Sequence, residues 1–382
     1  MKILYLADIR FPMERANGIQ TIETAHALAR RGAEVELVVR RTDGRSDEAC
    51  LEFFGLRPQP GLRLRRVSTP LGRWSTLAAA FALLVRARGR WDFVYTRDLV
   101  LAALALRLRT VPLIYEAHTV AAVFAEEHAR LYGADAVPSK SKLARLDARE
   151  RRVCSDARGV VTITGALQKA LEERHGKIAP SRMIPDGTRI PMAPPAFEGP
   201  HSPPSVYYIG QLYPWKGVDV LLEAMRYVSG AELVIVGGLP PEPDLDRLKR
   251  LASKLSLEDR VRFRGFVPPP ELPAERARAD LFVIPLLDST TARLFTSPLK
   301  LFEAMASGRP VVASDLPSIR EVLTHEKNAL LVPPGDARAL AGAIERLLRE
   351  RDLSRRLAAR AFEDVKAYSW DRRAEGISRF LD

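Results

Sequence analysis

Two lysines lie where a helix disfavours positive charge, and each follows a predicted strand. Lys300 falls in the first turn of a helix that Ser297 is expected to cap and Pro298 to begin. Lys216 lies beside the start of an earlier helix. A cation at a helix N-terminus is unfavourable unless an anion binds beside it, and the free N–H groups there bind phosphate oxygens. The two lysines therefore predict a site for a diphosphate, whose charge they would stabilise as it leaves.

Glu303 lies one turn beyond Lys300 on the same helix face. A carboxylate just past a phosphate site is well placed to accept two hydrogen bonds from a ribose diol. Gly308 suits the left-handed position that ends such a helix, and residues 310–313 then read as a buried parallel strand. This arrangement indicates a nucleoside diphosphate site. The alternative is an ordinary amphipathic helix with a solvated lysine and glutamate.

His118 and Gly18 follow predicted strands of the first half of the chain. Gly18 ends a loop at a helix start, where a glycine lets the backbone approach a phosphate or sugar closely. His118 follows the predicted strand 111–116 at the edge where open α/β sheets bind ligands. A single glycine and a single histidine are equally compatible with structural roles. The lysines supply the charge that a metal would otherwise supply, so we expect no metal.

The composition is that of an ordinary globular protein. The 382 residues are 47% hydrophobic and 28% charged, and this length predicts two or three domains. Cys50 and Cys154 have no partner spacing for a metal or a disulfide framework and are expected to be buried thiols. The chain opens with a predicted strand rather than a signal peptide, and its longest uncharged apolar block, 77–85, is too short to span a bilayer. We expect a cytoplasmic protein, peripheral to a membrane at most.

The net charge of +12 is concentrated in one segment. Residues 53–91 contain eight arginines, from Arg57 to Arg90, and no acid. Interleaved large apolar side chains give the segment a second, apolar side, which indicates docking on an anionic membrane surface. A solvated basic face is the alternative. No recognition motif supports nucleic acid as a partner.

Strands alternate with helices over residues 2–185 and again after residue 205, which predicts two doubly wound parallel sheets of the Rossmann-like α/β class. Prolines crowd the stretch between them. We therefore expect an N-terminal domain at 1–190, a linker at 191–204 and a C-terminal domain at 205–366, with a last helix at 367–382. Ligands should bind in a cleft facing the carboxyl ends of both sheets.

Four segments, 185–187, 210–217, 265–267 and 298–313, resemble those of glycosyltransferase family 4. The resemblance covers nearly the whole chain and implies the GT-B architecture and a retaining hexosyltransferase. It implies a nucleotide-sugar donor bound mainly by the second domain and an acceptor bound mainly by the first, with the last helix crossing back onto the first domain. The donor is expected to be a UDP- or GDP-sugar, the acceptor a lipid-linked compound or glycan, and no cofactor is expected.

The resemblance also implies roles for individual residues. His118 would contact the donor sugar near the reacting carbon, and Glu303 would bind the ribose hydroxyls. Val267 would pair its backbone with the base, and Gly18 would approach the phosphate from the other domain. The diphosphate would be held by the loop and helix start that contain Gly210, Gln211, Lys216, Ser297, Leu299, Lys300 and Leu301. The resemblance further implies a metal-independent reaction in which the leaving phosphate takes the acceptor proton.

Two positions depart from the family pattern. Gln211 stands where the family usually has an arginine, and Phe295 stands where it has the first of two glutamates eight positions apart. Lys300, Arg293 and Asp288 are the candidates to replace the missing contacts. Two other functions remain open at this point: a non-catalytic protein that binds a sugar nucleotide, and a GT-B epimerase that acts on the sugar nucleotide alone.

Overall fold

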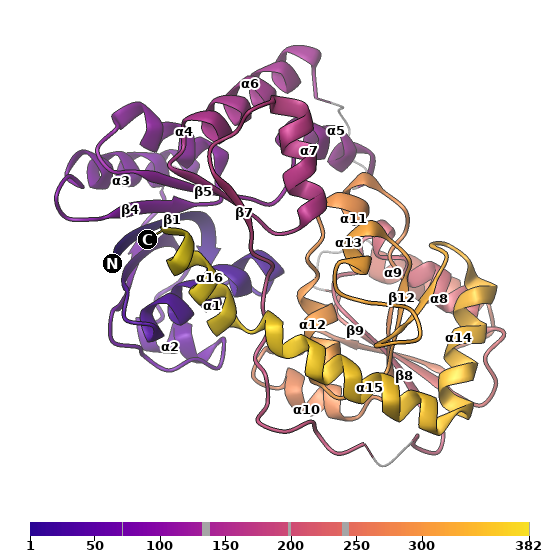
Figure 1. Ribbon diagram of the computed structural model, residues 1–382. Coiled ribbons are helices and arrows are strands. Elements are labelled where there is room, and N and C mark those ends of the chain that lie inside the picture. The colour runs from indigo at the N-terminus through magenta and orange to yellow at the C-terminus, as the bar shows by residue number, and fades with distance from the viewer. Residues whose placement is uncertain (71, 132–137, 198–199, 239–243, 382) are drawn as a thin grey trace. The chain divides into compact units, whose positions relative to one another are not determined.

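The computed structural model describes residues 1–70, 72–131, 138–197, 200–238 and 244–381. The chain forms two compact units (Figure 1). The first comprises Met1–Glu126, Pro138–Gly187 and Trp370–Asp382, and the second comprises Glu127–Val137 and Thr188–Ser369. The domain limits expected at residues 190 and 367 stay predictions. Residues 198 and 199 of the expected linker, residues 239–243 of the expected second domain and residue 382 of the expected last helix lie outside the described residues.

The first unit is built on a seven-stranded parallel sheet in the order β3-β2-β1-β4-β5-β6-β7. The order reverses between β1 and β4, so the carboxyl ends of these strands flank the point where doubly wound sheets bind ligands. The strands are β1 (Lys2–Phe11), β2 (Glu34–Arg41), β3 (Leu62–Val67), β4 (Phe93–Thr96), β5 (Leu113–Ala117), β6 (Gly159–Thr162) and β7 (Ser181–Met183).

Helices connect these strands, and the C-terminal helix returns to the same unit. Helix α16 packs against α1, while α4 packs against α3 and α6 (Figure 1). The helices of this part of the chain are α1 (Ala16–Arg30), α2 (Asp47–Glu52), α3 (Arg73–Val85), α4 (Leu99–Leu108), α5 (Ala121–Leu131), α6 (Lys140–Asp156), α7 (Gly165–His175) and α16 (Trp370–Leu381).

The second unit repeats the design with a six-stranded parallel sheet in the order β10-β9-β8-β11-β12-β13. Its strands are β8 (Ser205–Ile209), β9 (Glu232–Val236), β10 (Val261–Gly265), β11 (Leu281–Ile284), β12 (Val311–Ser314) and β13 (Leu330–Val332). Its helices are η1 (Pro214–Lys216), α8 (Val218–Met225), α9 (Asp244–Lys254), α10 (Leu272–Ala277), α11 (Thr290–Leu294), α12 (Leu299–Ala306), α13 (Pro317–Arg320), α14 (Ala337–Arg349), α15 (Arg351–Val365) and η2 (Lys366–Tyr368).

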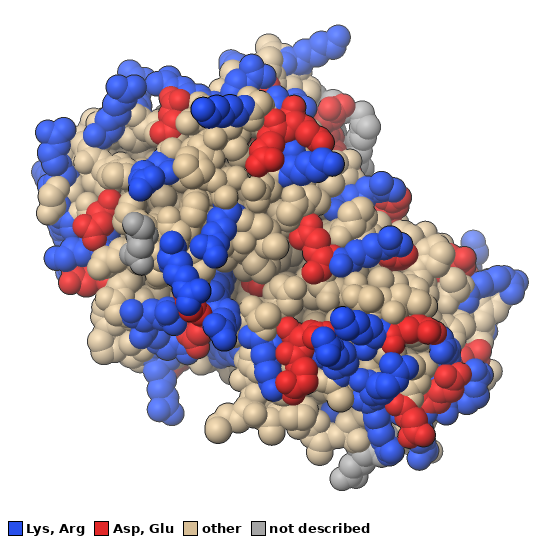
Figure 2. All heavy atoms as spheres, viewed as in Figure 1, with Lys and Arg blue, Asp and Glu red and all other residues tan. Residues whose placement is uncertain are grey.

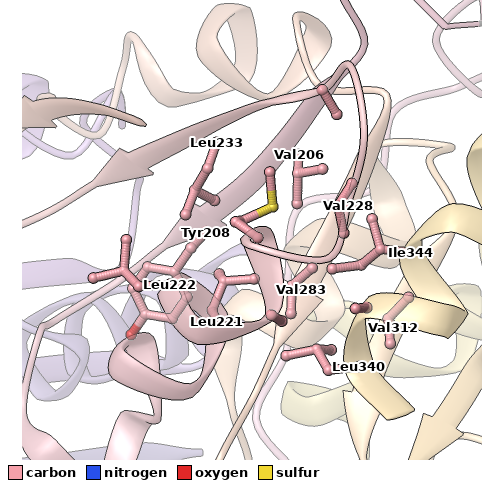
Figure 3. Close-up of a cluster of buried hydrophobic side chains, with 14 of the residues drawn as sticks. Val206, Tyr208, Leu221, Leu222, Val228, Leu233, Val283, Val312, Leu340 and Ile344 are labelled. Carbon is pink, nitrogen blue, oxygen red and sulfur yellow. The ribbon is translucent and has the colours of Figure 1, made fainter. Parts of the chain in front are cut away.

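Alternation along the strands gives the second unit a hydrophobic core on each face of its sheet. Along β8, Val206 and Tyr208 join one core and Tyr207 joins the other. The first core receives side chains of α8, α9 and α14, and the second receives those of α12 and α13. Figure 3 shows the first core, where Leu221 and Leu222 of α8 lie near the ring of Tyr208. Burial on both faces accounts for the near-continuous apolar runs of these strands.

The fold class predicted from the sequence, two Rossmann-like doubly wound domains of the GT-B type, is confirmed. One local prediction is wrong. Pro298 caps helix α12 with φ of −78° and ψ of 111°, so the helix begins at Leu299 and Ser297 is not its cap. Gly308 has the left-handed φ of +67° that was predicted. None of the helices in the described ranges combines the length and hydrophobicity that a bilayer crossing needs.

Candidate active site

Lys300 lies against the end of strand β8 in the second unit. Its Nζ donates to the Tyr208 hydroxyl at 3.0 Å and lies 4.4 Å from the centre of the Tyr208 ring. The Tyr208 hydroxyl donates in turn to the Gln211 carbonyl at 2.5 Å. Gly210 leaves room for this contact, because a Cβ there would lie 3.0 Å from Lys300 Nζ. The lysine thus joins the first turn of α12 to the loop after β8.

Lys216 is the last residue of η1, in that same loop. Its Nζ lies 3.5 Å from the centre of the Trp215 ring, which is itself buried. Gly217 follows with φ of +70°, and a Cβ there would lie 1.8 Å from the carbonyl oxygen of Pro285. Only glycine fits this turn, which fixes η1 beside the end of β11.

Both ammonium groups have lowered pKa values. Burial lowers the pKa of Lys300 to about 7. Burial, and then the positive charge of Lys300, lower the pKa of Lys216 well below its usual value. Neither lysine takes part in any ion pair found among the described residues. The predicted lysine pair is therefore brought together, and an anion bound here would restore the charged form of both groups.

Glu303 lies beside Lys300, as the helix spacing predicted, but it is not solvated. Its Oε2 lies 3.3 Å from Nη1 of Arg276, which belongs to α10. Both residues line a small cavity together with Lys300 and Ile209. The alternative of an ordinary surface glutamate is disfavoured, since Arg276 holds the Glu303 carboxylate at the end of β8.

The other predicted donor residues belong to the same unit but are not among those that line this cavity. Gln211 is half-buried and donates from Nε2 to the Tyr213 hydroxyl at 3.3 Å. Val267 is half-buried against the second core, and the Leu301 side chain is fully buried in it. The Leu301 N–H donates to the Pro298 carbonyl, so Leu301 has no backbone donor left for a ligand. Ser297 and Leu299 are half-buried just before and at the start of α12.

Phe295, the position of the missing family glutamate, is buried, with 6% of its surface exposed. Arg293 and Asp288, the candidates to replace that carboxylate, form an ion pair with each other. The Asp288 carboxylate is therefore already paired with Arg293. Of the three candidates, Lys300 alone lies in the donor cavity described above.

In the first unit, His118 contacts a carboxylate at the end of β5. Its Nε2 forms a hydrogen bond with Oε1 of Glu116. The spacing of two residues explains this contact, because alternate residues of a strand share a face. Glu116 is fully buried and also receives hydrogen bonds from Gln20, at 2.6 Å, and from the Tyr95 hydroxyl.

Arg373 of the C-terminal helix completes this cluster. Its Nη2 lies 2.7 Å from Glu116 Oε1, and its side chain is 1% exposed. Nη1 donates to the carbonyls of Ile184 and Pro185 at 2.7 and 2.8 Å, and Nε donates to Thr24 at 3.0 Å. Helix α16 is thereby tied to α1, β5 and the segment after β7.

Burial and neighbouring positive charge keep His118 neutral. Burial opposes ionisation of Glu116, but the charge of Arg373 and the hydrogen bond from His118 outweigh it and hold the pKa of Glu116 well below its usual range. Burial, and then the charge of Arg97, lower the pKa of His118 to about 4, although Glu116 opposes the shift. At neutral pH the imidazole therefore carries no charge; Nε2–H donates to the Glu116 carboxylate, so Nδ1 can accept one hydrogen bond.

Gly18 lies in the first turn of α1, where the structure gives it a local role. A Cβ there would lie 2.6 Å from the Met13 carbonyl oxygen, so the loop after β1 packs directly on this residue. Its N–H already donates to the Arg15 carbonyl and to Asn17 Oδ1 at 2.9 and 3.0 Å. The predicted approach of Gly18 to a phosphate stays a prediction.

Sequence reasoning missed the partners of the predicted residues: Tyr208, Arg276 and Arg373. Each comes from an element distant in sequence, and an arginine or tyrosine in those positions has no local signature. Among the described residues, no group of three or more histidine, cysteine, aspartate or glutamate side chains is placed to hold a metal ion. Asp244 of the Asp244-Leu245-Asp246 pair at the start of α9 binds Arg247.

Two family models match this chain. The model described as "Glycosyl transferase 4-like domain" matches residues 18–187, and the model described as "Glycosyl transferases group 1" matches residues 203–350. The chain belongs to glycosyltransferase family 4. The expected enzyme class, a hexosyltransferase with a nucleotide-sugar donor, is confirmed with it.

The relatives of this glycosyltransferase carry names that describe different activities. The D-inositol 3-phosphate glycosyltransferase of Nocardia farcinica is 28% identical over 94% of this chain and 82% of its own length. A GDP-mannose-dependent phosphatidylinositol monomannoside mannosyltransferase of Mycobacterium tuberculosis is 36% identical, over 47% of each chain.

Two solved structures share the fold of the whole glycosyltransferase. Sucrose-phosphate synthase of Thermosynechococcus elongatus superposes with a TM-score of 0.78 at 23% identity, covering 100% of this chain and 98% of the other. Anabaena HepE, solved in complex with UDP and glucose, superposes with a TM-score of 0.76 at 23% identity, covering 100% and 99%.

The lysine pair of the glycosyltransferase gives a first prediction. Lys216→Ala and Lys300→Ala should each weaken binding of the donor nucleotide by roughly 1.5–3 kcal/mol, the worth of a charge-assisted hydrogen bond. Calorimetric titration with UDP and with GDP measures this loss. Lys254→Ala, an exposed lysine at the end of α9, should leave binding unchanged. If neither of the first two variants binds more weakly than the control, the diphosphate assignment is wrong.

Arg373 gives a second prediction. Arg373→Met leaves the buried Glu116 carboxylate without its counter-charge, which should cost about 3–5 kcal/mol of unfolding free energy. Urea unfolding measures this. Arg372→Met is the matched control, because Arg372 is exposed and pairs with Glu375 on the surface of the same helix. Equal stability of the two variants would contradict the account of the Glu116 cluster.

Proposed function

We propose that this chain is a retaining, metal-independent glycosyltransferase that moves a hexosyl group from a UDP- or GDP-sugar to a lipid-linked or glycan acceptor. One observation carries the proposal: Lys216 and Lys300 lie together at the strand ends of the second unit, and no carboxylate of the described residues pairs with either. Glycosyl transfer from a nucleotide sugar releases a diphosphate, and these two groups fit its growing negative charge.

The lysine pair also supports independence from a metal. In a metal-dependent transferase a divalent cation neutralises the leaving diphosphate. Here two ammonium groups, two backbone N–H groups at the start of α12 and the dipole of that helix supply positive charge at one place. The names of two relatives support the choice of donor, since one is GDP-mannose-dependent and another was solved with UDP and glucose.

If the configuration is retained, the state of the carboxylates near the predicted reacting groups favours a front-face step over a covalent intermediate. Glu116 is engaged by four side chains, and Glu303 is paired with Arg276. Neither is free to attack the sugar as a nucleophile. In the proposed front-face step, the acceptor oxygen bonds to the anomeric carbon while the bond to the phosphate breaks on the same face. The acceptor proton passes to the leaving phosphate oxygen, and neutral His118 orients the sugar by a hydrogen bond.

A second candidate function is a protein that binds a sugar nucleotide without turning it over. The buried side chain of Phe295, at the position of a family carboxylate, favours this candidate. It predicts donor binding with no transfer to any acceptor. The proposed transferase predicts both.

Product analysis tests the proposed reaction. We expect an α-linked product from an α-linked donor, seen in the coupling constant of the anomeric proton, and the same rate with and without EDTA. His118→Ala should lower turnover with little change in donor affinity. An inverted product, or activity lost in EDTA and restored by Mg²⁺, would contradict the proposal. His26→Ala, a histidine of α1 outside the Glu116 cluster, serves as the control.

The proposed location is the cytoplasm, with peripheral attachment to the inner face of the membrane through α3. The exposed side of α3 carries an apolar stripe at helical spacing: Trp74 is 74% exposed, Phe81 49% and Val85 51%. Exposed arginines, Arg86 and Arg88, follow it. A helix with this pattern suits the interface of an anionic bilayer.

The structure shows which arginines of the basic segment between Arg57 and Arg90 have carboxylate partners. The segment itself has no acid, but four of its arginines pair with acids from elsewhere in the first unit, so their charges are compensated. These pairs are Arg65 and Arg90 with Glu36, Arg66 with Asp47, and Arg73 with Asp98. The proposed membrane contact therefore rests on α3 and the residues that follow it.

Vesicle sedimentation tests this attachment. We expect binding to vesicles that contain phosphatidylglycerol, weakening as salt rises, and little binding to phosphatidylcholine alone. Trp74→Ser with Phe81→Ser should reduce binding about tenfold or more, because large apolar area leaves the interface. Tyr227→Ser, an exposed aromatic of the second unit, should not. Equal binding of all three proteins would exclude α3 as the anchor.

A further inference from the structure

A cavity of the first unit has a volume of about 500 Å³ and is not part of the donor site. It lies at the carboxyl edge of the sheet, where Asp98 follows β4 and Thr119 follows β5. Thr119 is the residue directly after His118. The cavity therefore opens beside the histidine that the proposed function places at the reacting sugar.

The cavity has an apolar wall. Leu99 and Val100 contribute from the start of α4, and Phe124 contributes from α5. Leu146 of α6 also lines the cavity and is half-buried. A wall of this kind fits a ring or hydrocarbon portion of a ligand, while a volume of this size fits a small molecule.

Its other wall is basic and comes mainly from α6. Lys142, Arg145 and Arg149 all line the cavity, at spacings of three and four residues that place them on one face of the helix. None of them takes part in an ion pair among the described residues, whereas Arg151 and Arg152 on the same helix pair with Asp147 and Asp156. Figure 2 shows lysine and arginine side chains gathered where α6 lies in Figure 1.

Asp98, an acid that lines the cavity, already has several partners. Asp98 accepts hydrogen bonds from the N–H groups of Val100 and Leu101 at 2.8 and 2.9 Å and pairs with Arg73 at 3.1 Å. That leaves three like charges along one helix face, an arrangement that destabilises a helix. Lys142 adds a second cost, because it lies in the first turn next to the cap Ser139. A bound anion would remove both costs.

We infer that this cavity binds an acceptor through a phosphate group, which contacts Arg145 and Arg149 of α6 while the rest of the acceptor packs on the apolar wall. The inference rests on the proposed glycosyl transfer and specifies its acceptor as a phosphomonoester. The phosphate anchors the acceptor, and the hydroxyl that receives the sugar then lies on the side of Thr119 and His118. The charged group is thereby kept away from the reacting atoms.

Binding of phosphate probes tests the inference. The measurements use the full chain carrying Lys216→Ala and Lys300→Ala, so that the donor site does not bind the probe. Glucose 6-phosphate, with glucose as its neutral counterpart, represents a soluble phosphomonoester. Vesicles of phosphatidylcholine with and without phosphatidic acid represent a phosphomonoester at a membrane.

Two pairs of substitutions on the same helix supply the comparison. Arg145→Ser with Arg149→Ser removes two cavity arginines. Arg151→Ser with Arg152→Ser removes two arginines that already have carboxylate partners. We expect the first pair to weaken binding of one phosphate probe at least tenfold and the second pair to leave it unchanged within about twofold. The probe that responds identifies the source of the phosphate, soluble or lipid.

Three results would overturn the inference: no binding of either phosphate probe, equal binding by both pairs of variants, or glucose binding as tightly as glucose 6-phosphate. Donor binding distinguishes this failure from failure of the proposed function. With Lys216 and Lys300 intact, the Arg145→Ser, Arg149→Ser protein should bind UDP or GDP as the unmodified chain does. If the unmodified chain binds neither UDP nor GDP, it is the proposed function that is wrong.

Discussion

Two lysines held close together, with no counter-ion in the part of the chain that the structure describes, are the constraint around which the second unit is organised. Gly210 has no side chain, so Lys300 can reach Tyr208, and Gly217 packs on Pro285, so η1 carries Lys216 to the same place. Burial lowers both pKa values, so the charged form of either lysine is disfavoured unless an anion binds beside it. A fold that keeps such a pair gains from it only when an anion binds, and a departing nucleoside diphosphate is the anion that glycosyl transfer produces.

The first unit depends on the opposite arrangement, a buried charge that is fully compensated. Glu116 receives hydrogen bonds or ion pairs from four side chains, among them Arg373 of the C-terminal helix. This cluster fixes His118 in a neutral state and ties the last helix to the sheet edge that carries it. One unit thus holds unpaired charge ready for a ligand, and the other uses paired charge to position a neutral group.

The sequence was informative where local physics decides the outcome. The alternation of strands with helices predicted two parallel sheets, and helix spacing placed Glu303 beside Lys300. The cap of α12 was misplaced by one residue, because proline fits either the cap or the first helical position and ψ alone distinguishes them. Tyr208, Arg276 and Arg373 were not predicted, since which distant side chain meets a given residue depends on strand order and helix packing. The counter-ions of the acid-free arginine segment were not predicted for the same reason, because they come from other elements.

The most direct test of the account is the proton balance of donor binding. Because burial lowers the pKa of Lys300 to about 7, its amine is largely neutral at pH 8 and should gain a proton when a diphosphate binds. Calorimetric titration with UDP and GDP at pH 8, in two buffers of different ionisation enthalpy, measures the protons taken up. The account predicts proton uptake that falls by about one proton in Lys300→Met, while Lys216, whose pKa is also lowered, still contributes its own. Binding without proton uptake, or the same uptake in both proteins, would contradict it.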